Sequence, residues 1–296
     1  MDNSVGKKPL LKIGWLRVLF FLVVYFFVLL LFAVLVVLLL TGIKAGDLRA
    51  DIAQSFSYMG SGSMWLIAAI EFLSSVVSVF LFRKFVDRKS FTSLGFGTKG
   101  HWHEMAGGFF LAPALIGLGL VFLYTTKHLE WDYNGFNSQT FFIDAGTLMI
   151  LAFSEELMFR GYVLNNLMES FGKWTALIIS AMLFALFHLG NPGISTIPFV
   201  SIFLAGILFG INYIYTRNLW FSLLLHFSWN FFEGPLYGFK VSGLHFSSLL
   251  QTDLKGDISI TGGDFGFEGS FVATALLLIT VLFFYLFYEK KFRADN

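Results

Sequence analysis

Long apolar runs separated by short polar segments dominate the sequence. The first run, residues 18–40, contains 23 residues without a charge, which is enough to cross a hydrocarbon core of ~30 Å as a helix. It is too long for the apolar part of a signal peptide, so we expect a retained helix. Seven further runs bring the number of predicted membrane spans to eight; they lie near 62–82, 104–125, 141–164, 175–189, 196–215, 218–236 and 270–288.

Composition supports this interpretation. Hydrophobic residues make up 56% of the 296 positions, charged residues only 13%, and phenylalanine alone occupies 39 positions. A soluble domain typically carries about 25% charged residues. The chain has no cysteine, which excludes thiol nucleophiles and Cys-ligated metals. Its net charge of +1 gives no indication of nucleic-acid binding. We therefore predict an all-α polytopic integral membrane protein whose single transmembrane domain spans 1–296.

The distribution of Lys and Arg predicts the orientation. With the N-terminus inside, inner segments hold 14 of the 20 basic residues and outer segments hold five, including Lys44 and Arg49, while Arg160 lies within a span. Cytoplasmic loops carry an excess of basic residues, so both termini are predicted to be cytoplasmic. The long loop 237–268 is then outside, and segment 128–140 is expected at the membrane interface.

Ionisable and polar residues interrupt three of the predicted spans. The fourth carries Glu155, Glu156 and Arg160, the fifth ends near His188, and the seventh carries His226 and Asn230. Each charged group in hydrocarbon costs roughly 2.5–3.5 kcal/mol on insertion scales. These side chains are therefore expected to face the interior of the bundle or a hydrated cavity.

Helical spacing divides these residues into groups. Glu156 and Arg160 are four apart and can form an ion pair on one face, whereas Glu155 is turned by ~100° and remains free. His226 and Asn230 are also four apart. A single buried histidine is commonly a packing residue, but polar groups from three separate helices favour one shared site.

Two other acidic residues fit structural roles better. Glu71 stands alone in the second span and is expected to pack against a neighbouring helix, and Glu233 is expected at the outer interface. Neither belongs to the predicted site.

Amide hydrolysis is the chemistry that this set supports. A shielded carboxylate with a histidine can activate water, while a second histidine and an amide can donate to an oxyanion. Alternatively, Glu155, His188 and His226 are acceptable zinc ligands with room for a water. The sequence contains neither H-E-x-x-H nor G-x-S-x-G, which argues against those hydrolase classes.

At these residues the sequence resembles the CPBP family of intramembrane proteases, also called the Abi or CAAX-protease family, which includes type II CAAX prenyl endopeptidases and bacteriocin-immunity proteins. The motif E-E-x-x-x-R matches Glu155, Glu156 and Arg160, F-x-x-x-H matches Phe184 and His188, and H-x-x-x-N matches His226 and Asn230. The resemblance covers about 90–236, the predicted protease core.

The resemblance implies a role for each motif residue. Glu155 activates water with help from His188, His226 and Asn230 form the oxyanion site or complete a metal site, and Glu156 and Arg160 organise the cavity. Both a zinc-dependent and a metal-free glutamate mechanism agree with it. The implied substrate is a peptide or membrane protein in the lipid bilayer, and composition suits a bacterial plasma-membrane protein.

Two functions from other classes stay open at this level. A non-catalytic immunity or scaffolding protein of the same fold would use the polar cluster for binding or packing. A small transporter would fit Glu71 and the Gly-rich third span, but the paired broken helices typical of transporters are missing.

Overall fold

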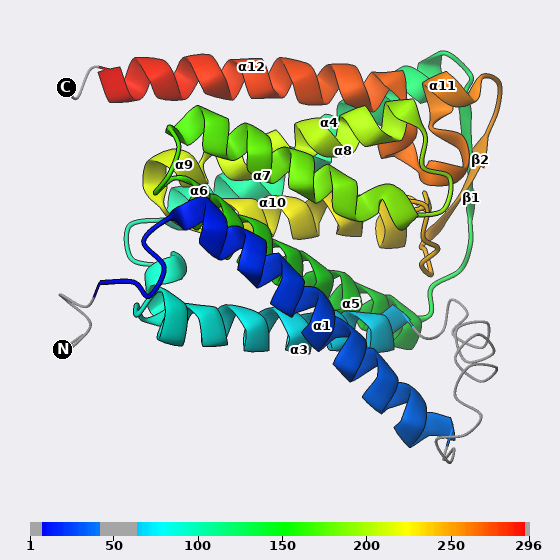
Figure 1. Ribbon diagram of the computed structural model, residues 1–296. Helices are drawn as coiled ribbons and strands as arrows, with labels where there is room; N and C mark the ends of the chain where they lie inside the picture. Colours follow the sequence, from blue (N-terminus) through cyan, green and yellow to red (C-terminus); the bar gives the residue numbers. More distant parts are fainter. Residues whose placement is uncertain (1–7, 42–63, 294–296) are drawn as a thin grey trace.

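The structure, a computed structural model, describes residues 8–41 and 64–293. Its helices form one bundle with a small two-stranded sheet at one end (Figure 1). The α-helices are α1 (Gly14–Thr41), α3 (Met64–Leu81), α4 (Trp102–Thr125), α5 (Ser138–Glu156), α6 (Asn165–Leu167), α7 (Lys173–Phe187), α8 (Thr196–Ile211), α9 (Tyr213–Thr216), α10 (Trp220–Phe231), α11 (Ile258–Thr261) and α12 (Phe271–Arg293).

A helix is present at each of the eight predicted positions, and the helical fold class is confirmed. Among the residues that the structure describes, six helical stretches are long and apolar enough to cross a membrane, and they cover 14–39, 64–86, 102–125, 173–190, 196–216 and 271–292. Helices α5 and α10 are outside this set, and they carry Glu155, Glu156, His226 and Asn230. Four of the predicted site residues therefore lie on helices outside this set, whereas His188 lies near the end of the stretch 173–190.

The arrangement separates inner helices from peripheral ones. Helices α7, α8 and α10 lie between α12 on one side and α3 on the other, and α1 crosses obliquely over α3 and α5 (Figure 1). The stretch that contains α8 is 72% buried, whereas those that contain α1 and α12 are 17% and 22% buried. Exposed aliphatic residues such as Leu30 and Leu282 cover the outer faces, as expected for helices that face lipid.

Small residues allow α7 and α8 to approach closely. A side chain at Gly206 would lie 3.1 Å from Ala181, and one at Gly210 would lie 2.5 Å from Leu177. The spacing Gly206-x-x-x-Gly210 is typical of such close contacts between helices in membranes. It brings the backbone of α8 next to the helix that carries Arg160.

The segment after α4 contains a β-strand, and its expected place at the membrane interface stays a prediction. Residues Leu129–Tyr133 form β1, which pairs antiparallel with β2 (Leu250–Leu254). The two strands join the expected interfacial segment to the loop 237–268 (Figure 1). Residues 129–133 alternate between apolar and acidic side chains, which is the pattern of a strand, but the run is only five residues long and no strand was predicted there.

The run that holds the double-glutamate motif changes helix type. Asn137 caps α5, because its side chain accepts from the backbone N–H groups of Gln139 and Thr140. At Glu156 the α-helix passes into a π-helical turn over Leu157–Leu164. Such turns are rare and frequently occur at functional sites.

Five charged residues form an ion-pair cluster near the start of α1, which we call the N-terminal ion-pair cluster. Arg17 and Arg83 both bind Asp87, at 3.0 and 2.8 Å, and Glu169 binds Arg17 and, at 2.7 Å, Lys89. Because these residues come from distant parts of the chain, the cluster fixes one end of α1 to the bundle.

The ends of the described chain agree with termini on one side of the membrane. Helix α1 begins and α12 ends at the same end of the bundle (Figure 1). Which compartment that end faces stays a prediction. Lys7, Lys44 and Arg49, three of the residues used in that prediction, lie outside the described part of the chain.

Candidate active site

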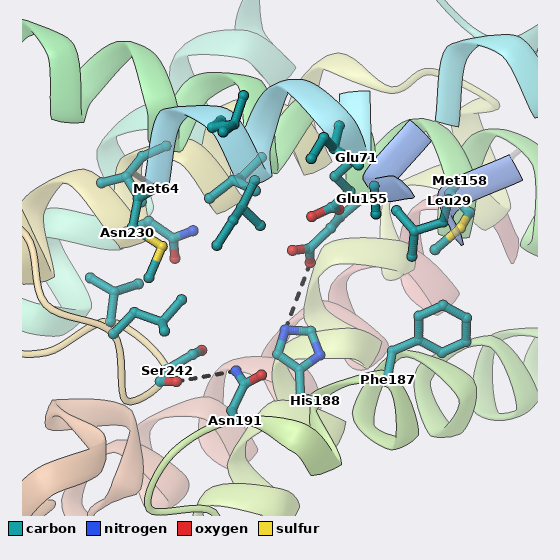
Figure 2. Close-up of a pocket in the computed structure, with 18 of the residues that line it drawn as sticks. Leu29, Met64, Glu71, Glu155, Met158, Phe187, His188, Asn191, Asn230 and Ser242 are labelled. Atoms are coloured by element: carbon teal, nitrogen blue, oxygen red, sulfur yellow. Dashed lines mark hydrogen bonds and ion pairs between the residues drawn. The ribbon is translucent and has the colours of Figure 1, made fainter. Parts of the chain in front are cut away.

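Polar residues that the sequence placed in one site meet at a cavity of about 720 Å³. Apolar residues of α1, α3 and α5 form much of its wall (Figure 2). Its polar lining consists of Glu71, Glu155, His188, Asn191, His226, Asn230 and Ser242. The predicted convergence of residues from three helical regions is therefore observed.

Glu155 lies at the centre of the polar part. Its side chain is 18% exposed, and its Oε2 atom is 3.8 Å from Nε2 of His188 and 4.0 Å from Nε2 of His226. Both separations exceed a direct hydrogen bond, and this buried Oε2 has no hydrogen-bond partner within the described structure. As the spacing predicted, Glu155 is free of Arg160.

Glu156 has a different environment one residue later. Its Oε1 atom accepts from Nη1 of Arg160 at 2.8 Å and lies 2.9 Å from Nδ1 of His226. Nη2 of Arg160 donates to the carbonyl oxygen of Gly206 at 2.9 Å. The predicted ion pair is thus present, and it also holds the second histidine.

Aromatic rings complete the surroundings of Arg160 and His226. The guanidinium lies 4.5 Å from the centre of the Phe184 ring, within range of a cation–π interaction. The His226 ring stacks on Phe209 at 4.7 Å. These contacts leave the arginine and the imidazole little freedom to reorient.

His188 is held by the residue that its motif pairs with it. The chain leaves α7 at this position, and His188 Nδ1 lies 2.8 Å from the carbonyl oxygen of Phe184. A carbonyl oxygen only accepts, so Nδ1 carries the proton and donates. In the neutral ring Nε2 is then an acceptor, and it faces Glu155.

The same reasoning applies to His226. The Glu156 carboxylate, which binds Arg160, accepts from Nδ1 of His226. Three acceptors consequently face one another when both rings are neutral: Nε2 of His188, Nε2 of His226 and Oε2 of Glu155. A proton donor between them, such as a water molecule, would satisfy this arrangement.

The donor types suit a zinc ion, but their positions do not fit one. Neighbouring ligands of a tetrahedral zinc with bonds of ~2.0–2.1 Å are closer together than the 3.8 and 4.0 Å seen between Glu155 and the histidines. Within the described residues, no group of three or more His, Cys, Asp or Glu side chains is arranged to hold a metal.

The remaining lining residues extend the site beyond the motifs. Asn230 lines the cavity as predicted, one turn after His226. Glu71, expected to be a packing residue, also lines it, and Figure 2 shows its side chain beside Glu155. Asn191 and Ser242 were missed, because neither belongs to a motif or a periodic apolar helix.

Glu233 is not a residue of an exposed interface. Its side chain is fully buried within the protein, and Oε1 accepts from the backbone N–H of Glu268 at 3.1 Å. It lies on the π-helical turn Phe232–Leu236 that continues α10. The loop 237–268 thus folds back onto this helix, which a count of polar residues could not reveal.

Comparison with known families gives a result for the part of the chain that holds the motifs. Residues 137–232 match a family model described as type II CAAX prenyl endopeptidase Rce1-like. No curated protein matches the chain significantly. The matched segment contains all of the E-E-x-x-x-R, F-x-x-x-H and H-x-x-x-N residues, whereas Glu71 and Ser242 lie outside it. This match confirms the resemblance to the CPBP, or CAAX-protease, family of intramembrane proteases.

Proposed function

We propose that this protein is an intramembrane endopeptidase in which Glu155 and His188 activate a water molecule. One observation carries the proposal. The carboxylate oxygen of Glu155 has no hydrogen-bond partner among the described residues, yet it faces two histidine nitrogens at 3.8 and 4.0 Å inside a cavity. A structural role leaves this unpaired carboxylate without an explanation, because burying an unsatisfied polar group is costly.

The reaction begins with the water. A water between Glu155 Oε2 and His188 Nε2 donates to both acceptors, and Glu155 takes its proton as the oxygen attacks the scissile carbonyl carbon. Glu155 and His188 then return a proton to the leaving amine. The carbonyl of Phe184 keeps the His188 ring oriented throughout.

The developing oxyanion needs hydrogen-bond donors. The Asn230 amide supplies one, and His226 supplies another when its Nε2 is protonated. Glu156, at 2.9 Å from Nδ1 of His226, stabilises the charged ring, and Arg160 holds Glu156 in place. Donors fixed in this way before the reaction stabilise the transition state most effectively.

The cavity favours an apolar substrate. Apolar side chains of α1 and α3 line it from Tyr25 to Val37 and from Met64 to Ile70, so the substrate proposed is a peptide or membrane protein with an apolar segment next to the cleaved bond. The setting proposed is a bacterial plasma membrane with both termini in the cytoplasm. Zinc dependence stays an alternative to be tested.

The test measures cleavage of a quenched fluorescent library of apolar peptides by the full chain in detergent micelles. Glu155→Gln and His188→Ala are expected to abolish cleavage, while Glu130→Gln, which changes an exposed carboxylate on β1, retains it. Melting curves establish that each variant is folded. Equal cleavage by Glu155→Gln and the unchanged chain would refute the proposal.

Metal dependence is examined with the same assay. Cleavage that persists in excess chelator, with no stoichiometric metal in the purified protein, supports the metal-free mechanism. Loss of cleavage in chelator with recovery on adding Zn²⁺ would contradict it and favour a zinc site.

A further inference from the structure

A tight turn forms part of the cavity wall beside the candidate site. The backbones of Val241 and Leu244 form two hydrogen bonds with each other, at 2.9 and 2.8 Å. Between them Ser242 and Gly243 have φ angles of +48° and +81°. Positive φ at both central residues is typical of a type I′ turn, where Asn-Gly is preferred over Ser-Gly. A serine here needs a further reason.

The tip of this turn is held from three directions. The N–H of Gly243 donates to the carbonyl oxygen of Phe265 at 2.8 Å, and the side-chain amide of Asn191 donates to the carbonyl oxygen of Ser242 at 3.1 Å. The Ser242 hydroxyl donates to Oε1 of Glu268 at 2.5 Å. The last contact gives the serine side chain a buried partner from a distant segment of the chain.

Glu268 is itself fixed inside the protein. Its residue is only 7% exposed, and its backbone N–H donates to Glu233, on the helical run that carries His226 and Asn230. Burial raises the pKa of the Glu268 carboxyl, and the hydrogen bond from Ser242 partly offsets this effect. A hydrogen bond in such an environment is stronger than one in water.

The contacts continue from the turn to His188. Asn191, which binds Ser242, also donates its backbone N–H to the carbonyl oxygen of His188 at 3.0 Å. Figure 2 shows Asn191 and Ser242 bonded at the wall of the cavity next to His188. A path of direct hydrogen bonds therefore runs from Glu268 through Ser242 and Asn191 to the segment that presents His188.

We propose that Glu268 is a positioning residue for substrate binding, which holds the turn 241–244 against Asn191 and so keeps the cavity wall next to His188 in its peptide-binding shape. This inference rests on the proposed endopeptidase function. Glu268 touches neither Glu155 nor the reacting atoms, and the wall contacts the substrate before and during the reaction alike. Losing it therefore weakens binding of substrate and transition state equally, which raises KM and leaves kcat nearly unchanged.

The experiment measures KM and kcat of cleavage for four variants. Glu268→Ala and Ser242→Ala remove the two partners of the hydrogen bond, Glu268→Gln keeps an acceptor oxygen, and Asp264→Asn alters a neighbouring carboxylate that is 89% exposed and binds Lys240. One lost hydrogen bond to a buried group corresponds to about a tenfold rise in KM. We expect that rise for both Ala variants, about twofold or less for Glu268→Gln, and none for Asp264→Asn.

A double variant separates positioning from general destabilisation. If Glu268 acts through Ser242, the variant carrying both Ala substitutions has nearly the KM of either single variant. Unchanged KM in folded Ala variants, a loss confined to kcat, or a multiplied effect in the double variant would overturn the proposal. Should Glu268→Ala fail to fold, Ser242→Ala and Glu268→Gln carry the test.

Binding without cleavage distinguishes this inference from the proposed function. The Kd of a fluorescent apolar peptide is measured with Glu155→Gln protein, alone and combined with Ser242→Ala. A weaker Kd in the combined variant supports the positioning role whether or not the chain cleaves peptides. An equal Kd contradicts that role even if Glu155 is catalytic.

Discussion

Two groups of charged residues in this bundle differ in how their charges are paired. In the N-terminal ion-pair cluster, Asp87 is shared by Arg17 and Arg83, and Glu169 is shared by Arg17 and Lys89. Each charged group there has an oppositely charged partner. Around the cavity, by contrast, Glu156 takes both Arg160 and His226, and the adjacent Glu155 has no hydrogen bond to its Oε2 atom.

The difference teaches how to separate structural from functional charges in an apolar bundle. Paired ions repay part of their desolvation cost through their partners, so a partner of opposite charge for each charged group is evidence for a structural role. An acceptor that remains unpaired beside other acceptors costs stability, and the protein retains it at the place where a substrate or water can bind. Substitutions in the two groups should accordingly change different measured quantities.

The largest effect is expected from Glu155→Gln. Loss of a general base lowers the cleavage rate by about 10²–10⁴-fold, while melting in detergent stays unchanged or rises slightly because an unpaired buried charge is removed. Rates and melting temperatures are measured on the same preparation. A fall in stability as large as that of an ion-pair variant would contradict the comparison.

Asp87→Asn should produce the reverse result. It leaves Arg17 and Arg83 without their shared carboxylate, and removing one partner of a buried pair costs about 3–5 kcal/mol in the free energy of unfolding. The kcat of the protein that remains folded should not change. Asp264→Asn, at an exposed ion pair, serves as the matched control; a selective loss of kcat in Asp87→Asn would break the distinction.

Asn230→Ala tests the oxyanion role within the cavity group. Loss of one donor is expected to lower kcat by about 10²–10³-fold with little change in KM. Asn230→His keeps a possible donor at this position and should restore part of the rate. If Ala and His variants have equal kcat, Asn230 does not donate to the oxyanion.

The smallest effect concerns the exposed edge of the ion-pair cluster. Burial alone would raise the pKa of Glu169, but Lys89 and Arg17 outweigh burial and lower it below 4.5. A lowered pKa stabilises the fold at neutral pH, and this contribution is lost on acidification below about 4.5. In Glu169→Gln, the loss of unfolding free energy on acidification should therefore be smaller by up to about 1 kcal/mol. An identical pH dependence of melting in both proteins would count against this role.

The sequence predicted the helical class and the meeting of Glu155, His188, His226 and Asn230. Polar and charged side chains in apolar helices are costly in hydrocarbon and are therefore expected to face a shared interior site. Helical spacing also predicted the Glu156–Arg160 pair. It could not predict that the backbone carbonyl of Phe184 accepts from His188, in addition to the contact of the Phe184 ring with the imidazole at 4.6 Å. The spacing of side chains along a helix predicts which side chains share a face. It does not predict which backbone groups at the end of the helix lack a hydrogen-bond partner.

Contacts between distant segments could not be predicted from the sequence for a related reason. Ser242, Asn191 and Glu268 lie in turns without a helical or strand period, so nothing fixes their direction until the chain has folded. The pairing of β1 with β2 joins segments more than a hundred residues apart. Such long-range partners follow from the packed bundle and not from local pattern.

The π-helical turn over Leu157–Leu164 has a consequence for both groups of charges. It separates Glu155 and Glu156 from Tyr162 and Asn166, which bind Asp87 at 3.4 and 3.5 Å. Its i→i+5 hydrogen bonds hold more residues per turn than an α-helix does, so the turn changes the direction in which the residues beyond it face. The wide turn therefore sets the orientation of the cavity carboxylates relative to the side chains that reach the N-terminal ion-pair cluster.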